Sequence, residues 1–131
     1  MATIFTKIIN REIPGYIVAE DDQHIAFLDI NPLQKGHTLV VPKREVDYVF
    51  DLDHQSLAGL FSFSKRVAKA IEQVIECERI GITVMGLEVP HAHVHLIPIQ
   101  AMDDMNFANM KLSFSKTEMG ELAKQIAENF S

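Results

Sequence analysis

The chain has 131 residues, 47% of them hydrophobic, which is enough to bury a single core without disulfides or bound metals. Its formal net charge of −6 argues against a nonspecific binder of nucleic-acid polymers, because such a protein needs a basic surface to release counterions. The one cysteine, Cys77, cannot form an internal disulfide, and we interpret it as a half-buried, inert thiol.

The first half of the chain predicts a short apolar entry segment and three strands. Residues 4–9 form the entry segment, helical or irregular, and an Ile-Pro-Gly turn closes it. An acidic turn at residues 21–22 separates two apolar runs, which is typical of a hairpin. The strands expected here are residues 16–20, 24–29 and 37–41.

The second half predicts two helices and two further strands. Apolar residues recur at spacings of three and four over residues 54–76, and Asp53 is placed to cap this long helix. Strands are expected at residues 80–85 and 90–97, and a capping box beginning at Ser115 opens a C-terminal helix. Strands predominate in the first two thirds around one long helix, which indicates an α+β fold.

No targeting or membrane segment is evident. The stretch Met1–Lys7 lacks the basic run followed by an apolar run of a secretory signal. No apolar segment approaches the roughly 20 residues needed to cross a membrane. Because no repeats, low-complexity tracts or linkers divide the chain, we expect a single domain over residues 1–131, in a cytoplasmic protein that contacts no membrane.

Three histidines recur at a spacing of two, at His91, His93 and His95. Successive side chains of a strand point to opposite faces, so we expect all three imidazoles on one face and the apolar residues between them on the other. Histidine titrates nearer neutrality than other side chains, so such a row can supply a nucleophile, a proton donor and an orienting partner. The row favours a catalytic site that handles phosphate.

Two other interpretations of the row stay open. A structural role is weakened because three rings in line would repel one another when charged. Paired histidines also suit zinc or copper. A cupin-like site, however, needs a glutamate a few residues downstream, and no acidic residue follows His95 until Asp103. We therefore expect no metal and no cofactor.

These residues and their surroundings resemble the histidine-triad (HIT) family of nucleotide hydrolases and transferases. The family's pattern of three alternating histidines followed by two apolar residues stands here at residues 91–97. Blocks similar to those of the family also occur at residues 4–9, 12–14, 26–32 and 36–43, in the same order and spacing. The resemblance covers about residues 3–98.

The resemblance implies a HIT-like fold, in which an antiparallel sheet of about five strands, a long helix and a C-terminal helix form each subunit. It further implies that the sheet continues across a homodimer. In a two-step reaction at the α-phosphate, His93 would be the nucleophile that carries a transient nucleotidyl group. His91 would orient that ring and fix its tautomer, His95 would hydrogen-bond a phosphate oxygen, and His37 would support His91.

The resemblance also implies a pocket for a purine nucleoside. Asp29 would accept hydrogen bonds from the ribose hydroxyls, since a carboxylate offers acceptors suited to a vicinal diol. The alternative role for Asp29 is to cap a turn. The alternative for the apolar residues of the pocket is ordinary packing in the core. The apolar slot expected around the purine consists of Phe5, Ile8, Phe27 and Ile30.

Two departures from the family bear on these expectations. Some bacterial members hold a structural zinc ion with cysteines and a histidine at places where this chain has Thr3, Thr6 and Glu45, so we expect no structural zinc. The loop before the triad is short, and it carries Leu87 and Glu88 where the family has phosphate-binding residues. A nucleoside monophosphate derivative is therefore the favoured substrate.

The function expected is hydrolysis or transfer at the α-phosphate of nucleoside 5'-monophosphate derivatives, such as purine phosphoramidates. The alternatives are a dinucleoside polyphosphate hydrolase, a nucleotide-binding regulatory module with little turnover, and a metal-binding protein. Outside the motifs, we interpret the C-terminal helix and the methionine-rich residues 102–110 as packing, and a place at the rim of the pocket or in the dimer is the alternative. We interpret His24 and His54 as surface residues.

Overall fold

One antiparallel sheet forms the centre of the protein, in a computed structural model that describes residues 3–131. Met1 and Ala2, which begin the stretch considered for a secretory signal, lie outside the described residues. The strand order is β1-β2-β3-β5-β4, and every neighbouring pair is antiparallel, which confirms the expected α+β, HIT-like sheet. The strands are β1 (Ile17–Glu20), β2 (His24–Leu28), β3 (Thr38–Pro42), β4 (Arg79–Thr83) and β5 (Val94–Ile99).

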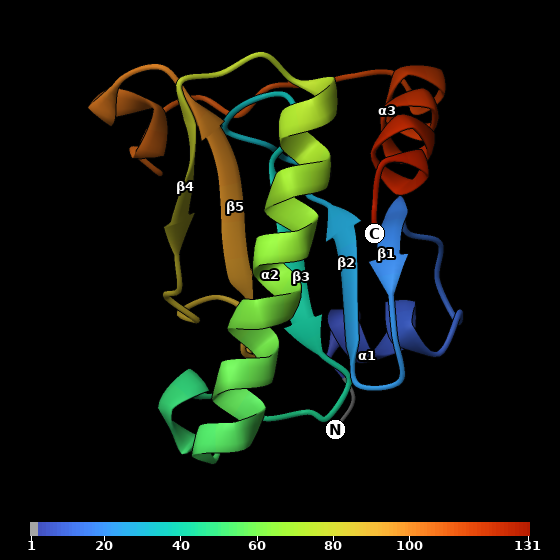
Figure 1. Ribbon diagram of the computed structural model, residues 1–131, viewed down its shortest axis with the longest axis vertical. Helices are drawn as coiled ribbons and strands as arrows, with labels where there is room; N and C mark the ends of the chain where they lie inside the picture. The colour runs from blue at the N-terminus through green and yellow to red at the C-terminus, as the bar shows by residue number, and fades with distance from the viewer. Residues whose placement is uncertain (1–2) are drawn as a thin grey trace.

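Three α-helices surround the sheet, and α2 lies along one face of it with α1 on the other (Figure 1). The Asp53 side chain accepts a hydrogen bond from the backbone N–H of Ser56 and so caps α2. Ser115 and Glu118 form the capping box expected at the start of α3. The helices are α1 (Ile4–Ile9), α2 (His54–Val74) and α3 (Lys116–Glu128), with the short 3-10 turns η1 (Val49–Asp51) and η2 (Met102–Met105).

Alternation along β3 and β5 divides the hydrophobic residues between two clusters. Val40, Val94 and Leu96 join the main cluster under α2 and α3. Leu39 and Val41 join a smaller cluster with α1 on the opposite face. His95 pairs with Leu39 in register, and it therefore lies on the α1 face. The sheet thus separates the histidines from the main core.

The last strand begins later than the sequence predicts. We expect a strand over residues 90–97, but β5 starts at Val94, so His91 and His93 precede it. The reason lies in β3, which ends at Pro42, a residue without an N–H to continue the ladder. The N–H of Ala92 instead donates to the carbonyl of Val46.

One of the two surface histidines was predicted wrongly. His24 is only 8% exposed, its ring stacks on Phe63 of α2 with centroids 5.1 Å apart, and its Nδ1 lies 3.0 Å from a carboxylate oxygen of Asp21. His24 is buried because its side chain leaves β2 on the face that α2 covers. His54 is exposed and Cys77 is half-buried, as expected, and burial raises the pKa of the Cys77 thiol.

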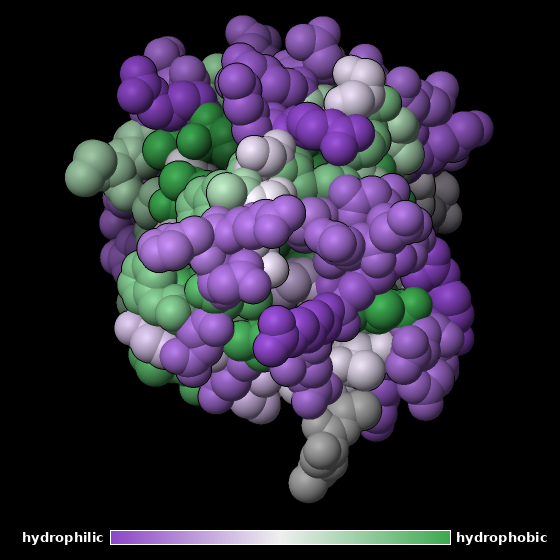
Figure 2. All heavy atoms as spheres, turned by 60° about the horizontal axis from the view of Figure 1, so that its bottom comes forward, coloured by the Kyte–Doolittle hydropathy of each residue, from purple (hydrophilic) through white to green (hydrophobic). Residues whose placement is uncertain are grey.

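Hydrophilic side chains cover most of the face at the lower end of the molecule, with hydrophobic residues in smaller patches between them (Figure 2). Within residues 3–131, no helix is both long enough and apolar enough to span a bilayer.

Candidate active site

Four buried histidines meet on the α1 face of the sheet. His91 and His93 come from the extended segment before β5, His95 from β5 itself, and His37 from the residue before β3. The ring centroids of His93 and His95 are 4.9 Å apart, and those of His95 and His37 are 5.2 Å apart. The alternating spacing therefore places the triad on one face even though only His95 belongs to a strand.

The hydrogen bonding of His93 leaves one ring nitrogen free for chemistry. Its Nδ1 lies 2.7 Å from the backbone carbonyl oxygen of His91, and because a carbonyl only accepts, Nδ1 carries a proton and donates. In the neutral ring, Nε2 then holds the lone pair. His91 thus fixes the tautomer of His93, as expected, and it does so through its backbone carbonyl.

A chain of two hydrogen bonds sets the tautomer of His95. The N–H of Leu33 donates to Nδ1 of His37 over 3.0 Å, so the proton of the neutral His37 ring is on Nε2. That Nε2 lies 3.0 Å from Nδ1 of His95 and donates to it. The proton of a neutral His95 is therefore on its Nε2. His37 supports His95, and the expectation that it supports His91 is wrong.

Burial keeps these rings uncharged near neutral pH. Burial lowers the pKa of His37 to about 3, and the neighbouring His95 and the Lys111 ammonium act in the same direction. Burial also lowers the pKa of His95 to about 4, assisted by His93. The pKa of His93 is lowered by burial too, although its hydrogen bond to the His91 carbonyl opposes the change. A neutral nucleophile and a neutral donor thus lie side by side.

His91 is held by Pro42 and by Thr3, and Thr3 is joined to Thr6 and Glu45, the three residues for which no structural zinc is expected. Its Nε2 donates to the carbonyl of Pro42 over 2.7 Å, and its Nδ1 lies 3.0 Å from the hydroxyl of Thr3. The Thr6 hydroxyl and the Thr3 N–H both donate to the Glu45 carboxylate, over 2.6 Å and 3.1 Å. Hydrogen bonds therefore tie α1 to the triad at this place.

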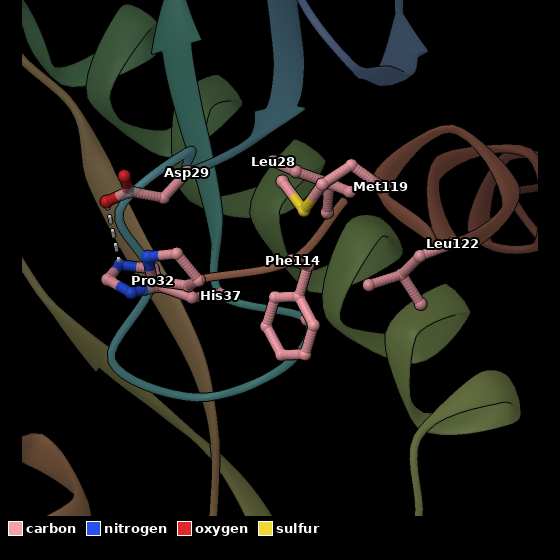
Figure 3. Close-up of a pocket in the computed structure, with 8 residues that line it drawn as sticks. Leu28, Asp29, Pro32, His37, Phe114, Met119 and Leu122 are labelled. Atoms are coloured by element: carbon pink, nitrogen blue, oxygen red, sulfur yellow. Dashed lines mark ion pairs between the residues drawn. The ribbon is translucent and has the colours of Figure 1, made fainter. Parts of the chain in front are cut away.

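Asp29 lies at the other end of the histidine cluster, directly after β2. One carboxylate oxygen accepts the N–H of Asn31, and the other lies 3.6 Å from Nε2 of His37, the contact drawn in Figure 3. Burial raises the pKa of this carboxyl, and the Glu88 carboxylate adds to the rise, against the Asn31 hydrogen bond and the Lys111 ammonium.

The turn that carries His37 packs against side chains on the side that faces α3. Gly36 has φ of 93°, a backbone conformation that suits glycine, and it places His37 directly before β3. On the side away from the Asp29 carboxylate, Leu28, Phe114, Met119 and Leu122 fill the space between the turn and α3 (Figure 3), and the crevice there leaves no room for a water molecule. The His37 ring is thus fixed in place.

The sequence profile of the HIT domain matches residues 10–102 of the chain, which include the four histidines and Asp29. The chain belongs to the HIT family. A HIT-like protein of Borreliella burgdorferi is 37% identical over 134 residues, covering 96% of each chain. An adenosine 5'-monophosphoramidase of Saccharomyces cerevisiae is 37% identical over 98 residues, covering 74% of this chain and 62% of the relative. The crystal structure of a HIT-like protein from Bartonella henselae superposes with a TM-score of 0.81 at 32% identity, covering 98% and 96% of the two chains.

Three of the four residues expected to form the apolar slot of this HIT domain pack together. Phe5, Ile8 and Phe27 belong to the small cluster on the α1 face, and the Phe5 ring contacts His93 with centroids 4.9 Å apart. Ile30 lies apart from them and is 65% exposed, beside Asp29. The packed residues are therefore placed next to the histidines, whereas Ile30 faces solvent.

One group of side chains in residues 3–131 has the spacing of a metal site, with ligand atoms of Asp29, His37 and His95 all within 4.8 Å of one another. Its donor set does not suit a divalent cation. Because Leu33 donates to Nδ1 of His37, the Nε2 that faces the group carries a proton and has no lone pair to offer. In this group, His37 and His95 form a hydrogen-bonded pair, and the Asp29 carboxylate lies beside His37.

The sequence did not indicate Phe107, which lies beside the histidines. Its ring meets that of His95 edge to face, with centroids 5.0 Å apart, and that of His37 at 6.2 Å. Packing is the favoured interpretation of residues 102–110 and the pocket rim the alternative, and it is the alternative that Phe107 fits. The HIT profile ends at residue 102, so no motif points to Phe107 itself. An aromatic residue in a polar, methionine-rich run was the one available signal.

Proposed function

We propose that this HIT protein is a nucleotide hydrolase or transferase that acts at the α-phosphate of nucleoside 5'-monophosphate derivatives, such as purine phosphoramidates. The observation that carries the proposal is the hydrogen bond from Nδ1 of His93 to the carbonyl of His91. It leaves the Nε2 lone pair free beside His95, whose Nε2 bears a proton. A nucleophile and a hydrogen-bond donor for phosphate therefore adjoin one another.

The reaction follows from these proton positions. Nε2 of His93 forms a bond to the α-phosphorus, and the bond from phosphorus to the leaving group breaks, with its electron pair going to the leaving group. The leaving group takes up a proton from solvent, and the water that attacks in the second step returns a proton to solvent. The ring becomes positively charged, and the His91 carbonyl that accepts its Nδ1–H stabilises this charge. His95 donates to a phosphate oxygen. Water or another acceptor then attacks phosphorus and displaces His93, which returns to its neutral form.

The nucleoside is assigned to Asp29 and to the apolar residues Phe5, Ile8 and Phe27. Phe27 stands two residues before Asp29, and the Phe5 ring contacts both Phe27 and His93. Yeast relatives named adenosine 5'-monophosphoramidases, 37% and 38% identical over about three quarters of this chain, support an adenosine substrate. The loop before the triad favours a short substrate, since Leu87 is 91% exposed and the adjacent Glu88 would repel a polyphosphate.

The proposal is tested by measuring release of AMP from adenosine 5'-phosphoramidate by the purified protein. Robust turnover supports it. Turnover of a dinucleoside polyphosphate alone would move the assignment to that substrate class. Tight binding of AMP without turnover of either substrate would overturn the enzymatic proposal in favour of a nucleotide-binding regulatory module, for which the position of Glu88 near the triad would be the physical reason.

Replacing Asp29 with asparagine should raise KM for adenosine 5'-phosphoramidate by about 10- to 100-fold, because two hydrogen bonds to a charged acceptor are weakened. The expected change in kcat is much smaller, since Asp29 is assigned to the ribose and not to the reacting phosphorus. Steady-state kinetics with the 2'-deoxy analogue provides the control. Because this analogue lacks one ribose hydroxyl, its KM should rise less than that of the parent substrate when Asp29 is replaced with asparagine. An equal loss for both substrates would contradict the ribose assignment.

We also propose that the protein is a homodimer joined through β4. Within the described residues this strand is an edge of the sheet, and Ile82 is 48% exposed on it, followed by Met85 at 46%. β1, at the other edge, is covered by α3. An exposed apolar edge strand is suited to pairing with a second copy.

Light scattering should therefore give twice the mass of one chain for the wild type. The substitution Ile82→Asp should shift the protein to a monomer, because it places a charge in the apolar contact. Glu76→Asp, a change that keeps the charge at an exposed site just after α2, serves as the control and should stay dimeric. A wild-type protein that is monomeric at micromolar concentration would contradict the proposal.

A further inference from the structure

The segment of residues 106–112, between η2 and α3, contacts the catalytic histidines. In Figure 1 the chain between these two elements crosses the end of the sheet from the β4–β5 side to α3 beside β1. Phe107 contacts the rings of His95 and His37, as described above. Three aromatic rings thus surround His95, those of His93, His37 and Phe107, and Phe107 alone has no polar atom.

Hydrogen bonds hold the 106–112 segment in this position. The ammonium of Lys111 donates to the carbonyls of Phe107 and Asn109, over 2.6 Å and 3.2 Å, and closes the turn between them. The Asn109 side chain donates to the carbonyl of Asp103 in η2. The N–H of Leu112 donates to the carbonyl of Pro32, in the same turn that carries His37. The segment is therefore fixed at both of its ends.

We propose that Phe107 is a positioning residue, which holds the ring of His95 against His37 and excludes water from their hydrogen bond, so that His95 presents its Nε2–H to phosphate. For its role in catalysis, this inference rests on the function proposed above. It concerns a residue beyond the part of the chain that the HIT profile matches.

The proton positions explain why exclusion of water matters at this place. His95 accepts from His37 at Nδ1, so a proton added to Nδ1 of His95 would set two donors against each other and break the bond. Burial is what lowers the pKa of His95, and the half-buried Phe107 ring is one of the apolar groups that cover the His95 ring. The titratable and charged groups around this pair are Asp29, His93, Glu88 and Lys111.

The inference is tested by following the imidazole nitrogens of His95 by NMR as a function of pH, which requires no turnover. In Phe107→Ala the pKa of His95 should move at least halfway from about 4 toward the ordinary 6.5. Phe107→Leu keeps an apolar cover and should retain the low pKa. Met110→Ala removes a side chain that is 90% exposed in the same segment and should behave as wild type.

Kinetics provides the second readout. For adenosine 5'-phosphoramidate, kcat of Phe107→Ala at pH 5 should fall at least about 2.5-fold relative to wild type, which is the loss of neutral His95 for a pKa moved halfway. KM should change little, as the acid limb of kcat moves to higher pH. Phe107→Gln, with a polar side chain, serves if the alanine variant does not fold. An unchanged His95 titration in either folded variant overturns the inference. An inactive wild type whose His95 titration still depends on Phe107 refutes the proposed function instead, and leaves the positioning of His95 supported.

Discussion

Replacing His93 with alanine is expected to lower kcat for adenosine 5'-phosphoramidate by at least about 10³-fold, because the nucleophile is lost and no covalent intermediate can form. Binding of AMP should persist within a few-fold, since the nucleoside contacts are assigned to Asp29 and the apolar residues near α1. The ring is 6% exposed, so the truncation leaves a small gap beside Phe5 with little effect on the fold. Steady-state kinetics and calorimetric titration with AMP measure the two effects.

A direct check is to trap the intermediate. Wild-type protein mixed with substrate and quenched in alkaline denaturant, where a phosphorus–nitrogen bond to histidine survives, should gain the mass of one adenylyl group. Peptide mapping should place it on the fragment with residues 91–95. His54→Ala, which changes an exposed histidine away from the site, is the matched control and should be labelled as wild type. Turnover by His93→Ala at the wild-type rate, or label on another histidine, would show that the nucleophile is misassigned.

Much of the fold was predictable because helices and strands each repeat their apolar residues at a characteristic spacing. The apolar spacing and the Asp53 cap predict α2 to within two residues at its end, and the strand runs predict β1, β2 and β3 closely. The spacing of the triad predicts one face for its rings even though the strand begins at Val94. Side-chain direction in an extended backbone alternates whether or not the ladder hydrogen bonds form, so this prediction survived the error in the strand boundary.

The roles of the individual histidines were less predictable because they depend on which atoms meet. The Leu33 N–H that sets His37, and through it His95, is a backbone group of a turn that no residue pattern encodes. Thr3 reaches Nδ1 of His91 from 88 residues away in the sequence. Contacts of this kind follow from the tertiary packing of α1, β3 and β5, and the spacing of residues along the chain does not predict them.

The buried histidines also make the stability of the protein depend on pH. In the unfolded chain a histidine titrates near 6.5, whereas burial holds the pKa of His95 at about 4 and that of His37 at about 3. Between these values the unfolded state binds more protons than the folded state, so acid favours unfolding. The free energy of unfolding should be highest above pH 6.5, where both rings are neutral in the folded and unfolded states, and should fall as pH decreases from 6.5 toward 4. From pH 7 to pH 5 the expected loss is about 2 kcal/mol for each ring.

Denaturant unfolding at pH 7, 6 and 5 measures this dependence. The double variant His37→Asn, His95→Asn should be less stable at pH 7 but lose less on acidification, because two of the three rings whose pKa burial lowers are gone and only His93 keeps its contribution. His54→Asn, at an exposed position, should keep the wild-type slope. The carboxylates whose pKa values are lowered by hydrogen bonds, such as Asp21, add their own losses only below about pH 4, the ordinary range of aspartate, so the interval from 7 to 5 isolates the histidines. A wild-type slope in the double variant would mean that the acid sensitivity arises elsewhere and that the His37–His95 pair does not stay neutral through burial.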